Sequence, residues 1–184
     1  MEKQELGRLL LHAAYLEGDF VLRSGKRSKY YLDKYLFETE PMVLRGIVHE
    51  MAMMIRNDLA SGREYDRIAA PELGAVVLGG GLSLELGMPL VLVRKQSKEY
   101  GTTKRIEGRL EPDERIVVVE DIVTSGGAAI SAVEALREAG AVVTDLYCVV
   151  DREEGGREAA RESGLELHPL FTSSELGILP VSKG

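Results

Sequence analysis

A short acidic and glycine-rich segment that follows an apolar strand constrains this chain more than any other feature. The apolar run 116–119 is followed at once by Glu120 and Asp121, then by the polar and glycine residues 124–127 and a helical pattern from about Ala128. Glycines let the backbone turn tightly so that its N–H groups converge, and a helix N-terminus adds positive dipole. The pattern predicts a phosphate-binding loop at the end of a buried strand.

The two carboxylates indicate what lies beside that phosphate. Thr124 and Ser125 can donate hydroxyl hydrogen bonds to a phosphate, whereas Glu120 and Asp121 repel it and suit a diol, a cation or a metal ion. A ribose 5-phosphate has a phosphate for the loop and neighbouring hydroxyls for the carboxylates. An ordinary helix cap would account for the two hydroxyls but not for the carboxylate pair or the double glycine. The segment is neither a Walker loop nor a dinucleotide fingerprint.

From residue 67 onward, strand and helix patterns alternate. We expect strands at 67–70, 90–93, 116–119, 142–150 and 165–171, and helices at 74–86, 126–139 and 156–163. Continuous apolar strands between helices predict a parallel sheet that is covered on both faces. Ligands of such sheets bind outside the carboxyl ends of the strands, so the loops there are expected on one rim. These loops comprise residues 70–74, 94–109, 120–127 and 151–156.

The N-terminal part has a different pattern. Apolar residues recur at helical spacing over 4–16, and the segments Phe20 to Leu22 and Tyr30 to Leu32 flank a polar turn, which predicts a two-stranded hairpin. Pro41 opens a further helix over roughly 42–59, because proline suits the first helical turn. We therefore expect an N-terminal helix and hairpin that precede the alternating core.

Length and composition limit the class of protein. The chain of 184 residues fits one domain, divided into a helix and hood over about 1–40 and a core over about 41–184. No apolar run approaches the roughly 18 residues that cross a bilayer, and the first residues resemble no secretory signal. The single cysteine, Cys148, excludes an internal disulfide and is expected in the core. From the first residues and this cysteine usage we expect a cytoplasmic protein. A net charge of -7 argues against nonspecific affinity for nucleic acid or anionic membranes.

One window is basic despite the acidic background. It comprises Arg94, Lys95, Lys98, Lys104 and Arg105, against Glu99 alone. A basic island on an acidic protein indicates a compact polyanionic ligand rather than a polymer. Arg94 and Lys98 are the stronger candidates because they lie nearest a strand end, whereas Lys104 and Arg105 fit a solvated loop equally well. Gly101 and Gly108 could act as hinges of a loop that closes over the ligand.

Residues 117–128 closely resemble the phosphoribosyl diphosphate signature of the type I phosphoribosyltransferases. The resemblance implies an α/β fold in which helices flank a parallel sheet, with a small N-terminal hood. It also implies that the acids contact the ribose hydroxyls and that the loop backbone holds the 5-phosphate. The positions assigned to phosphoribosyl diphosphate by this segment are Glu120, Asp121, Ile122, Val123, Thr124, Ser125, Gly126, Gly127 and Ala128.

Three further stretches resemble the orotate phosphoribosyltransferases within that family. They are 20–33 with Ser24-Gly25, the basic loop 94–101, and Asp151-Arg152. The resemblance implies that orotate is bound by Thr124 and Arg152, and that Lys98, Glu120 and Asp121 are catalytic. It further implies a homodimer with shared active sites and a Mg²⁺ ion held mainly through the substrate, with no protein ligand singled out. The remaining contacts that it assigns to phosphoribosyl diphosphate are Arg23, Arg94, Lys95, Lys98 and Tyr100.

The expected reaction transfers the 5-phosphoribosyl group from phosphoribosyl diphosphate to orotate, in pyrimidine synthesis. A guanidinium fork at Arg152 suits the orotate carboxylate, although a surface arginine paired with Asp151 or Glu153 is the alternative. Tyr100 stands where many relatives have a histidine, so no histidine acid is expected there. Two other functions remain open: transfer to a purine base, and a regulator that senses phosphoribosyl diphosphate without catalysis.

Overall fold

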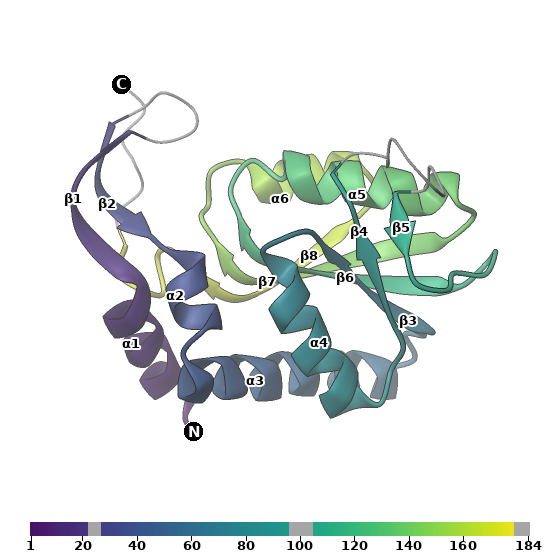
Figure 1. Ribbon diagram of the computed structural model, residues 1–184, viewed down its shortest axis with the longest axis horizontal. Coiled ribbons are helices and arrows are strands. Elements are labelled where there is room, and N and C mark those ends of the chain that lie inside the picture. The colour runs from purple at the N-terminus through teal and green to yellow at the C-terminus, as the bar shows by residue number, and fades with distance from the viewer. Residues whose placement is uncertain (22–26, 96–104, 179–184) are drawn as a thin grey trace.

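The computed structural model describes residues 1–21, 27–95 and 105–178. Its helices are α1 (Lys3–Ala14), α2 (Lys34–Glu38), α3 (Pro41–Ala60), α4 (Ala75–Leu86), α5 (Gly127–Glu138) and α6 (Gly156–Glu162). Its strands are β1 (Tyr15–Val21), β2 (Arg27–Leu32), β3 (Arg67–Pro71), β4 (Leu90–Val93), β5 (Ile106–Glu107), β6 (Arg115–Val123), β7 (Val142–Asp151) and β8 (Glu166–Thr172). Figure 1 shows a central sheet between helices, with the β1–β2 hairpin beside it.

The central sheet confirms the predicted parallel architecture. Within the described residues its strand order is β5-β4-β3-β6-β7-β8, and every neighbouring pair is parallel except β4 with β5. Strand β5 lies inside the segment 94–109, for which the sequence predicted only a loop. Its Ile106 pairs with Val93, and Glu107 pairs with Leu92. Two residues are too few for an alternating pattern to reveal a strand.

Strand β6 is longer than the sequence predicted. The expected strand ended at Val119 and placed Glu120 and Asp121 in a loop, but β6 continues to Val123. Glu120 pairs with Cys148 of β7, so the acids belong to the sheet itself. The prediction was wrong because carboxylates are rarely buried in a strand unless they have a partner. The two acids are therefore held by strand hydrogen bonds rather than by a loop.

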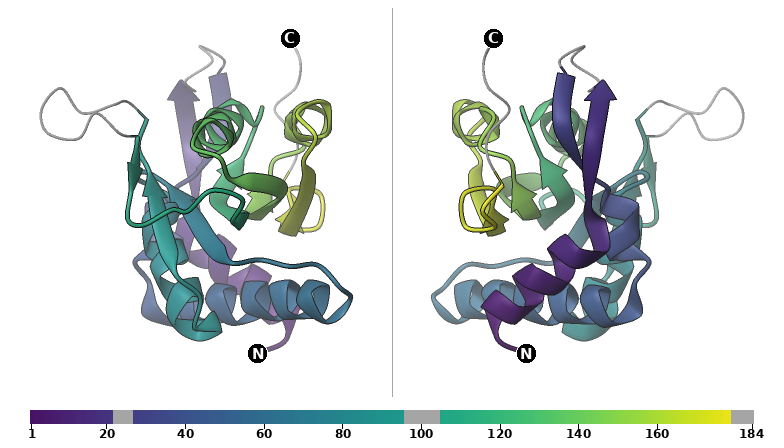
Figure 2. Two further views of the ribbon diagram at one scale, coloured as in Figure 1. Left: turned by 90° about the vertical axis from the view of Figure 1, so that its right-hand side faces the viewer. Right: turned by 90° about the vertical axis from the view of Figure 1, so that its left-hand side faces the viewer.

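Helices cover both faces of the sheet, and this explains why its strands are apolar throughout (Figure 2). Successive side chains of a strand point to opposite faces. Val117 and Val119 of β6 join the core formed with α1, α3 and α4, whereas Ile116 and Val118 join the core formed with α5 and α6. All four are buried, so no polar position lies between Arg115 at the start of the strand and Glu120.

The N-terminal hood consists of the antiparallel pair β1–β2 and the short helix α2. Ser28, Tyr30 and Leu32 alternate with exposed residues along β2, as expected for a strand with one buried face. Helix α2 was not predicted, since its five residues are too short to show helical periodicity. Asp33 begins it by accepting a hydrogen bond from the backbone N–H of Tyr35 at 3.0 Å. Figure 1 shows the hairpin projecting past the rest of the molecule.

Two composition-based expectations can be compared with the fold. Cys148 is fully buried in β7, which confirms its predicted place in the core. Among the helices that the structure describes, none combines the length and apolar character needed to span a membrane.

Candidate active site

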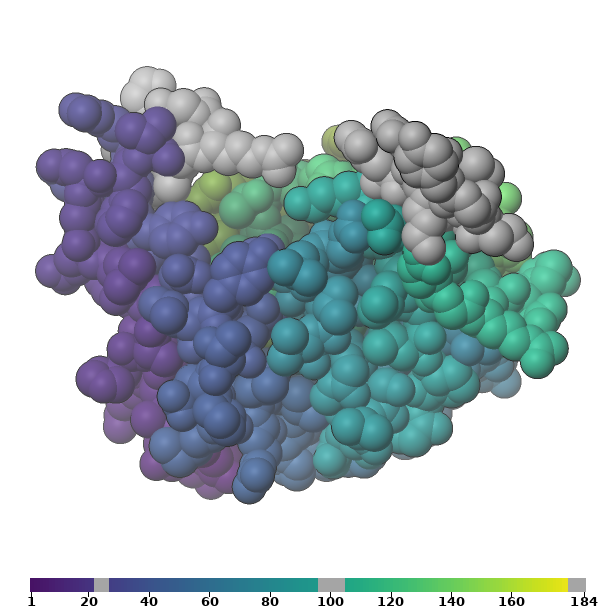
Figure 3. Space-filling model, in the orientation of Figure 1, coloured from purple at the N-terminus to yellow at the C-terminus, as the bar shows by residue number. Residues whose placement is uncertain are grey.

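The carboxyl ends of the parallel strands share one rim, as predicted. The backbone N–H of Glu72 donates to the carbonyl of Val93 at 2.8 Å, and its carboxylate accepts from the N–H of Lys95 at 2.9 Å. The N–H of Arg152 donates to the carbonyl of Val123 at 2.8 Å. These contacts join the end of β3 to that of β4 and the end of β7 to that of β6. Figure 3 shows the surface hollowed beside this rim, between the purple hood and the teal body.

The predicted phosphate-binding loop begins where β6 ends. Gly126 has φ of 81° and immediately precedes α5, which starts at Gly127, so the first N–H groups of α5 are open to a ligand. Gly156 lies against the same loop: a side chain there would collide with Val123 and with the carbonyl of Thr124. The rim residues Thr124, Ser125, Gly127 and Ala128 are exposed, Gly126 and Val123 are buried, and Ile122 is half-buried.

The acid pair at the end of β6 is almost closed to solvent. Glu120 is 8% exposed and Asp121 is 1% exposed. Asp121 forms an ion pair with Lys34 of α2 at 2.7 Å, and its backbone N–H donates to Glu120 at 3.2 Å. Burial, together with the charge of Asp121, raises the pKa of Glu120 to about 8. Asp121 therefore has a cationic partner, while its neighbour Glu120 tends to keep its proton at neutral pH.

Helix α2 and the loop before α4 complete the surroundings of these acids, and sequence reasoning missed both contributions. Glu38, one turn after Lys34, is 2% exposed, and burial followed by the charge of Asp121 raises its pKa to about 8. Gly74 lies so close that a Cβ there would overlap Asp121 and Lys34. The spacing of Lys34 and Glu38 was the available signal, since side chains four residues apart share one helix face.

Arg152 is a buried arginine at the end of β7. It is 7% exposed, donates to the hydroxyl of Tyr30 in the hood at 2.8 Å, and forms an ion pair with Glu154 at 3.1 Å. The alternative of a surface arginine paired with Asp151 or Glu153 is therefore wrong. Its Nε atom is buried and has no hydrogen-bond partner among the described residues. A partly satisfied guanidinium at the rim is suited to receive a planar anionic group.

The basic segment is described only at its two ends. Arg94 lies 3.8 Å from Glu107, and its Nε is buried without a hydrogen-bond partner in the described part of the chain. Arg105 donates to the carbonyl of Arg94 and to Ser131 of α5, so it ties β5 to the body and is not a solvated charge. The backbone of Lys95 is held by the carboxylate noted above. Four side chains that the sequence analysis named lie outside the described residues. They are the three cations Arg23, Lys98 and Lys104 and the phenol Tyr100.

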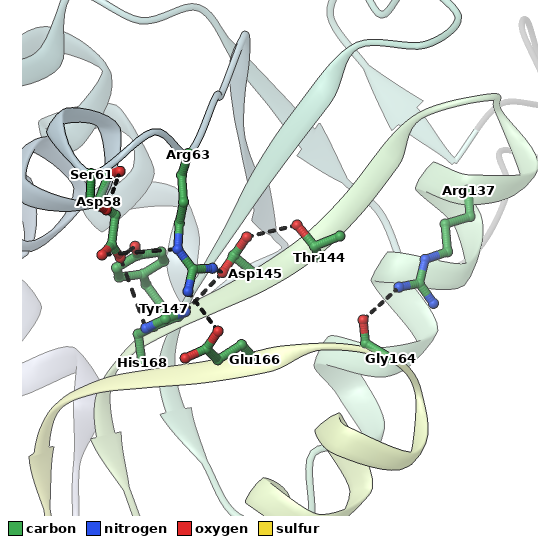
Figure 4. Close-up of polar contacts among 10 residues, drawn as sticks. All are labelled: Asp58, Ser61, Arg63, Arg137, Thr144, Asp145, Tyr147, Gly164, Glu166 and His168. Atoms are coloured by element: carbon green, nitrogen blue, oxygen red, sulfur yellow. Dashed lines mark hydrogen bonds and ion pairs between the residues drawn. The ribbon is translucent and has the colours of Figure 1, made fainter.

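A second polar cluster lies at the opposite edge of the sheet (Figure 4). Asp145, Glu166 and His168 bring together ligand atoms of the kind that metals bind. However, Arg63 donates to Asp145 and, at 2.6 Å, to Glu166, while His168 contacts Asp145 at 2.9 Å. The His168 ring also stacks on Tyr147 with centroids 4.5 Å apart. The guanidinium already balances these acids, so the cluster acts as a structural tie.

Comparison with known proteins agrees with this arrangement. The model of the phosphoribosyl transferase domain matches residues 40–162. The orotate phosphoribosyltransferase of Halobacterium salinarum is 50% identical over 159 residues, which cover 86% of this chain and 87% of the relative. That of Pyrococcus abyssi is 44% identical over 176 residues, covering 95% and 94%.

Solved structures give the same result. The crystal structure of the Mycobacterium tuberculosis orotate phosphoribosyltransferase superposes with a TM-score of 0.80 at 28% identity and covers 95% of this chain and 98% of that one. The shared fold, the predicted phosphate-binding loop after β6 and the extent of these matches lead to one assignment. The chain belongs to the phosphoribosyltransferase family and, within it, to the orotate phosphoribosyltransferases.

Proposed function

We propose that the chain transfers the 5-phosphoribosyl group from phosphoribosyl diphosphate to orotate, giving orotidine 5'-monophosphate and diphosphate. One observation carries the proposal: the loop after β6 and Arg152 after β7 meet at one rim, joined by the 2.8 Å hydrogen bond from Arg152 to Val123. The curated relatives at 44% and 50% identity are named for the same reaction.

In this proposal the ribose phosphate occupies the loop between β6 and α5. The first N–H groups of α5 and the hydroxyls of Thr124 and Ser125 hold the 5-phosphate, aided by the positive end of the helix dipole. Glu120 and Asp121 accept hydrogen bonds from the ribose hydroxyls beside it. Their position at a strand end favours the proposal, because groups on rigid elements are held in place before the substrate binds.

The base lies between the loop and Arg152. The buried Nε of Arg152, without a partner in the described residues, is a donor that awaits an acceptor such as the orotate carboxylate. Thr124 is exposed on the same loop and can contact the base. A purine has no carboxylate to match a buried guanidinium, so this residue favours orotate over hypoxanthine, xanthine or adenine.

The leaving diphosphate lies toward the ends of β3 and β4. Positive charge develops on the ribose and negative charge on the diphosphate, so cations there stabilise the transition state, by several kcal/mol in a dry site. Arg94 and Lys95 border this region, and Arg23, Lys98 and Tyr100 are assigned to the same role from their sequence positions. The backbone N–H groups at the start of α4 would also contact the diphosphate.

The rim also fits a magnesium ion held through the substrate. Carboxylate, hydroxyl and phosphate oxygens are the donors that Mg²⁺ prefers, but Asp121 is already paired with Lys34 at 2.7 Å. Bound mainly to the diphosphate, Mg²⁺ would neutralise charge on the departing group. The protein residues of the rim orient the substrate and exclude water, whose attack would compete with transfer.

Two wider expectations belong to the same proposal. A homodimer is supported by large apolar side chains exposed on neighbouring helices, Met53 of α3 and Val77 and Leu84 of α4, because such side chains are common at subunit interfaces. A cytoplasmic location is supported by the use of a single cysteine, which is typical of reducing compartments. Sedimentation velocity would test the dimer directly.

The function is tested by measuring diphosphate release with Mg²⁺, phosphoribosyl diphosphate and one base at a time. Release is expected with orotate and not with hypoxanthine, xanthine or adenine. Release with a purine alone would make the protein a purine phosphoribosyltransferase. If phosphoribosyl diphosphate binds but no base gives release, the protein is a regulator rather than an enzyme.

A further inference from the structure

The hood contributes a charged side chain to the acid pair of the ribose site. Lys34 of α2 reaches the carboxylate of Asp121 at 2.7 Å, although the two residues lie on different parts of the fold. The Asp121 side chain is only 2% exposed and that of Lys34 is 31% exposed. The contact is therefore formed at the inner side of the rim, where water screens charges weakly.

The packing around this ion pair leaves little freedom for its two partners. Gly74 lies at the start of α4 in ordinary helical conformation, with φ of -55°. A Cβ at this position would overlap both Oδ2 of Asp121 and Nζ of Lys34. Three segments far apart in sequence therefore meet at one point, and the glycine is required by the contact rather than by backbone conformation.

The charges at this point are unequal in number. Three carboxyl groups, of Glu38, Glu120 and Asp121, surround the one ammonium of Lys34. Burial alone would lower the pKa of Lys34, but the hydrogen bond and charge of Asp121, with the charge of Glu120, raise it. Burial raises the pKa of Glu38 and of Glu120 to about 8 in each case. The ammonium contacts Asp121, whereas burial favours the protonated form of the other two carboxyl groups.

We propose that Lys34 is a positioning residue of the phosphoribosyl site, which holds the Asp121 side chain toward the ribose hydroxyls and links the hood to that site. This inference rests on the proposed function, because it assigns Asp121 to the ribose. An ionised carboxylate offers about four acceptor positions, so Asp121 can hold Lys34 and still accept hydrogen bonds from the substrate. Without the ammonium, Asp121 would lose the cation that holds its carboxylate in place. The pKa of Glu120 and of Glu38 would also rise further, because the charge of Lys34 lowers both.

The variant Lys34→Met tests this role, since methionine keeps most of the stem and removes the charge. We expect the KM for phosphoribosyl diphosphate to rise about tenfold or more. The KM for orotate should change by less than about threefold. The acid limb of kcat/KM for phosphoribosyl diphosphate should move to higher pH. Lys29→Met is the matched control: Lys29 is also in the hood, but its side chain is 85% exposed and pairs with Asp19.

Binding of phosphoribosyl diphosphate and Mg²⁺ without a base, measured by calorimetry, separates this inference from the proposed function. If the unaltered protein does not bind, the proposed function fails. If it binds and Lys34→Met binds equally well or more tightly, Lys34 does not position Asp121 or merely blocks the site, and the inference is overturned.

A double-mutant cycle covers the case in which Lys34→Met folds poorly. In the Asp121→Asn background, where no buried charge needs a partner, Lys34→Met should weaken binding by less than about twofold. An equally large loss in both backgrounds would mean that Lys34 acts independently of Asp121, and this would also overturn the inference.

Discussion

At the scale of single residues, the three consecutive glycines of α4 differ in how closely neighbouring elements pack against them. A Cβ at Gly79 would press on Ala70 of β3, and one at Gly81 would press on Val48 of α3, each at 2.6 Å. Gly80 between them has nothing within 4 Å. Two of the glycines therefore permit close packing of α4 on both neighbours, and the third does not.

This difference predicts opposite effects of alanine at two helical glycines. Gly80→Ala should stabilise the protein by about 0.4–1 kcal/mol, because it restricts the unfolded chain without a clash. Gly74→Ala should destabilise it by about 1–3 kcal/mol, because the added methyl overlaps the Lys34–Asp121 pair. Urea unfolding measures both values. A neutral or stabilising Gly74→Ala would contradict the tight packing at that point.

Arg152 is the residue to which the proposed function assigns base specificity. Replacing it with lysine keeps the charge but removes the planar fork, so the KM for orotate should rise at least about tenfold. The KM for phosphoribosyl diphosphate should change little, and steady-state kinetics with each substrate varied would resolve the two. Tyr30→Phe is the control, since it removes the hydroxyl that accepts from Arg152 but keeps the ring. An unchanged orotate KM in Arg152→Lys would remove Arg152 from base recognition.

At the scale of elements, the sequence predicted the helices and strands that have a periodic apolar pattern, and it missed the shortest ones. The long apolar strands and amphipathic helices were found because burial on one or two faces leaves a periodic pattern. Helix α2 and strand β5 were missed because five and two residues carry no period. The end of β6 was misplaced at Val119 because Asp121 is paired with Lys34 and Glu120 lies opposite Cys148 of β7. Local sequence reveals neither of these tertiary contacts.

Glu38 of helix α2 makes the free energy of unfolding depend on pH. The pKa of Glu38 is about 8 in the folded protein, above its ordinary value of 4.5, so the folded state holds a proton that the unfolded state has released. Between about pH 4.5 and pH 8 this group lowers stability as pH rises, by up to ~1.4 kcal/mol per pH unit. Below that window the loss is absent, and above it the loss is complete.

Glu38→Gln should therefore gain stability over the unaltered protein as pH rises from 5 to 8. The two proteins should differ least near pH 5, because glutamine imitates the protonated carboxyl. Chemical unfolding at pH 5, 6, 7 and 8 gives the difference at each step. Glu40→Gln, at an exposed position two residues later, controls for the substitution itself. A stability difference that does not grow with pH would mean that Glu38 is ionised throughout.

At the scale of the whole molecule, the two edges of the sheet carry different tasks. The carboxyl edge gathers Arg94 and Arg152, whose buried Nε atoms have no hydrogen-bond partner among the described residues and are suited to a ligand. The amino edge gathers Arg63, Asp145 and His168 into a paired network. The sequence predicted the first edge from its motifs. It did not predict the second, because Arg63 and Asp145 are distant in the chain and meet only after the sheet forms.

This division predicts that the network at the amino edge can be weakened without loss of the site. Burial would raise the pKa of Asp145, but hydrogen bonds from His168 and Thr144 and the charge of Arg63 lower it. Its charge therefore stabilises the fold above the unfolded pKa, and this contribution is lost as pH falls through the folded value. Asp145→Asn should cost roughly 2–4 kcal/mol at pH 7, because the buried partners lose their counter-charge, and the difference should shrink below about pH 4.

Glu166→Gln is the matched comparison, because the same arginine holds this carboxylate at an exposed position, with 62% of its side chain accessible. It should cost less than about 1 kcal/mol, as surface ion pairs do. Both variants should keep the KM for phosphoribosyl diphosphate and for orotate at temperatures where they are folded, since neither residue touches the rim. Equal losses of stability in the two variants would place the value of the network in Arg63 alone. A changed KM in Asp145→Asn would show that the two edges of the sheet are coupled. Substrate binding would then depend on the amino edge as well as on the carboxyl edge.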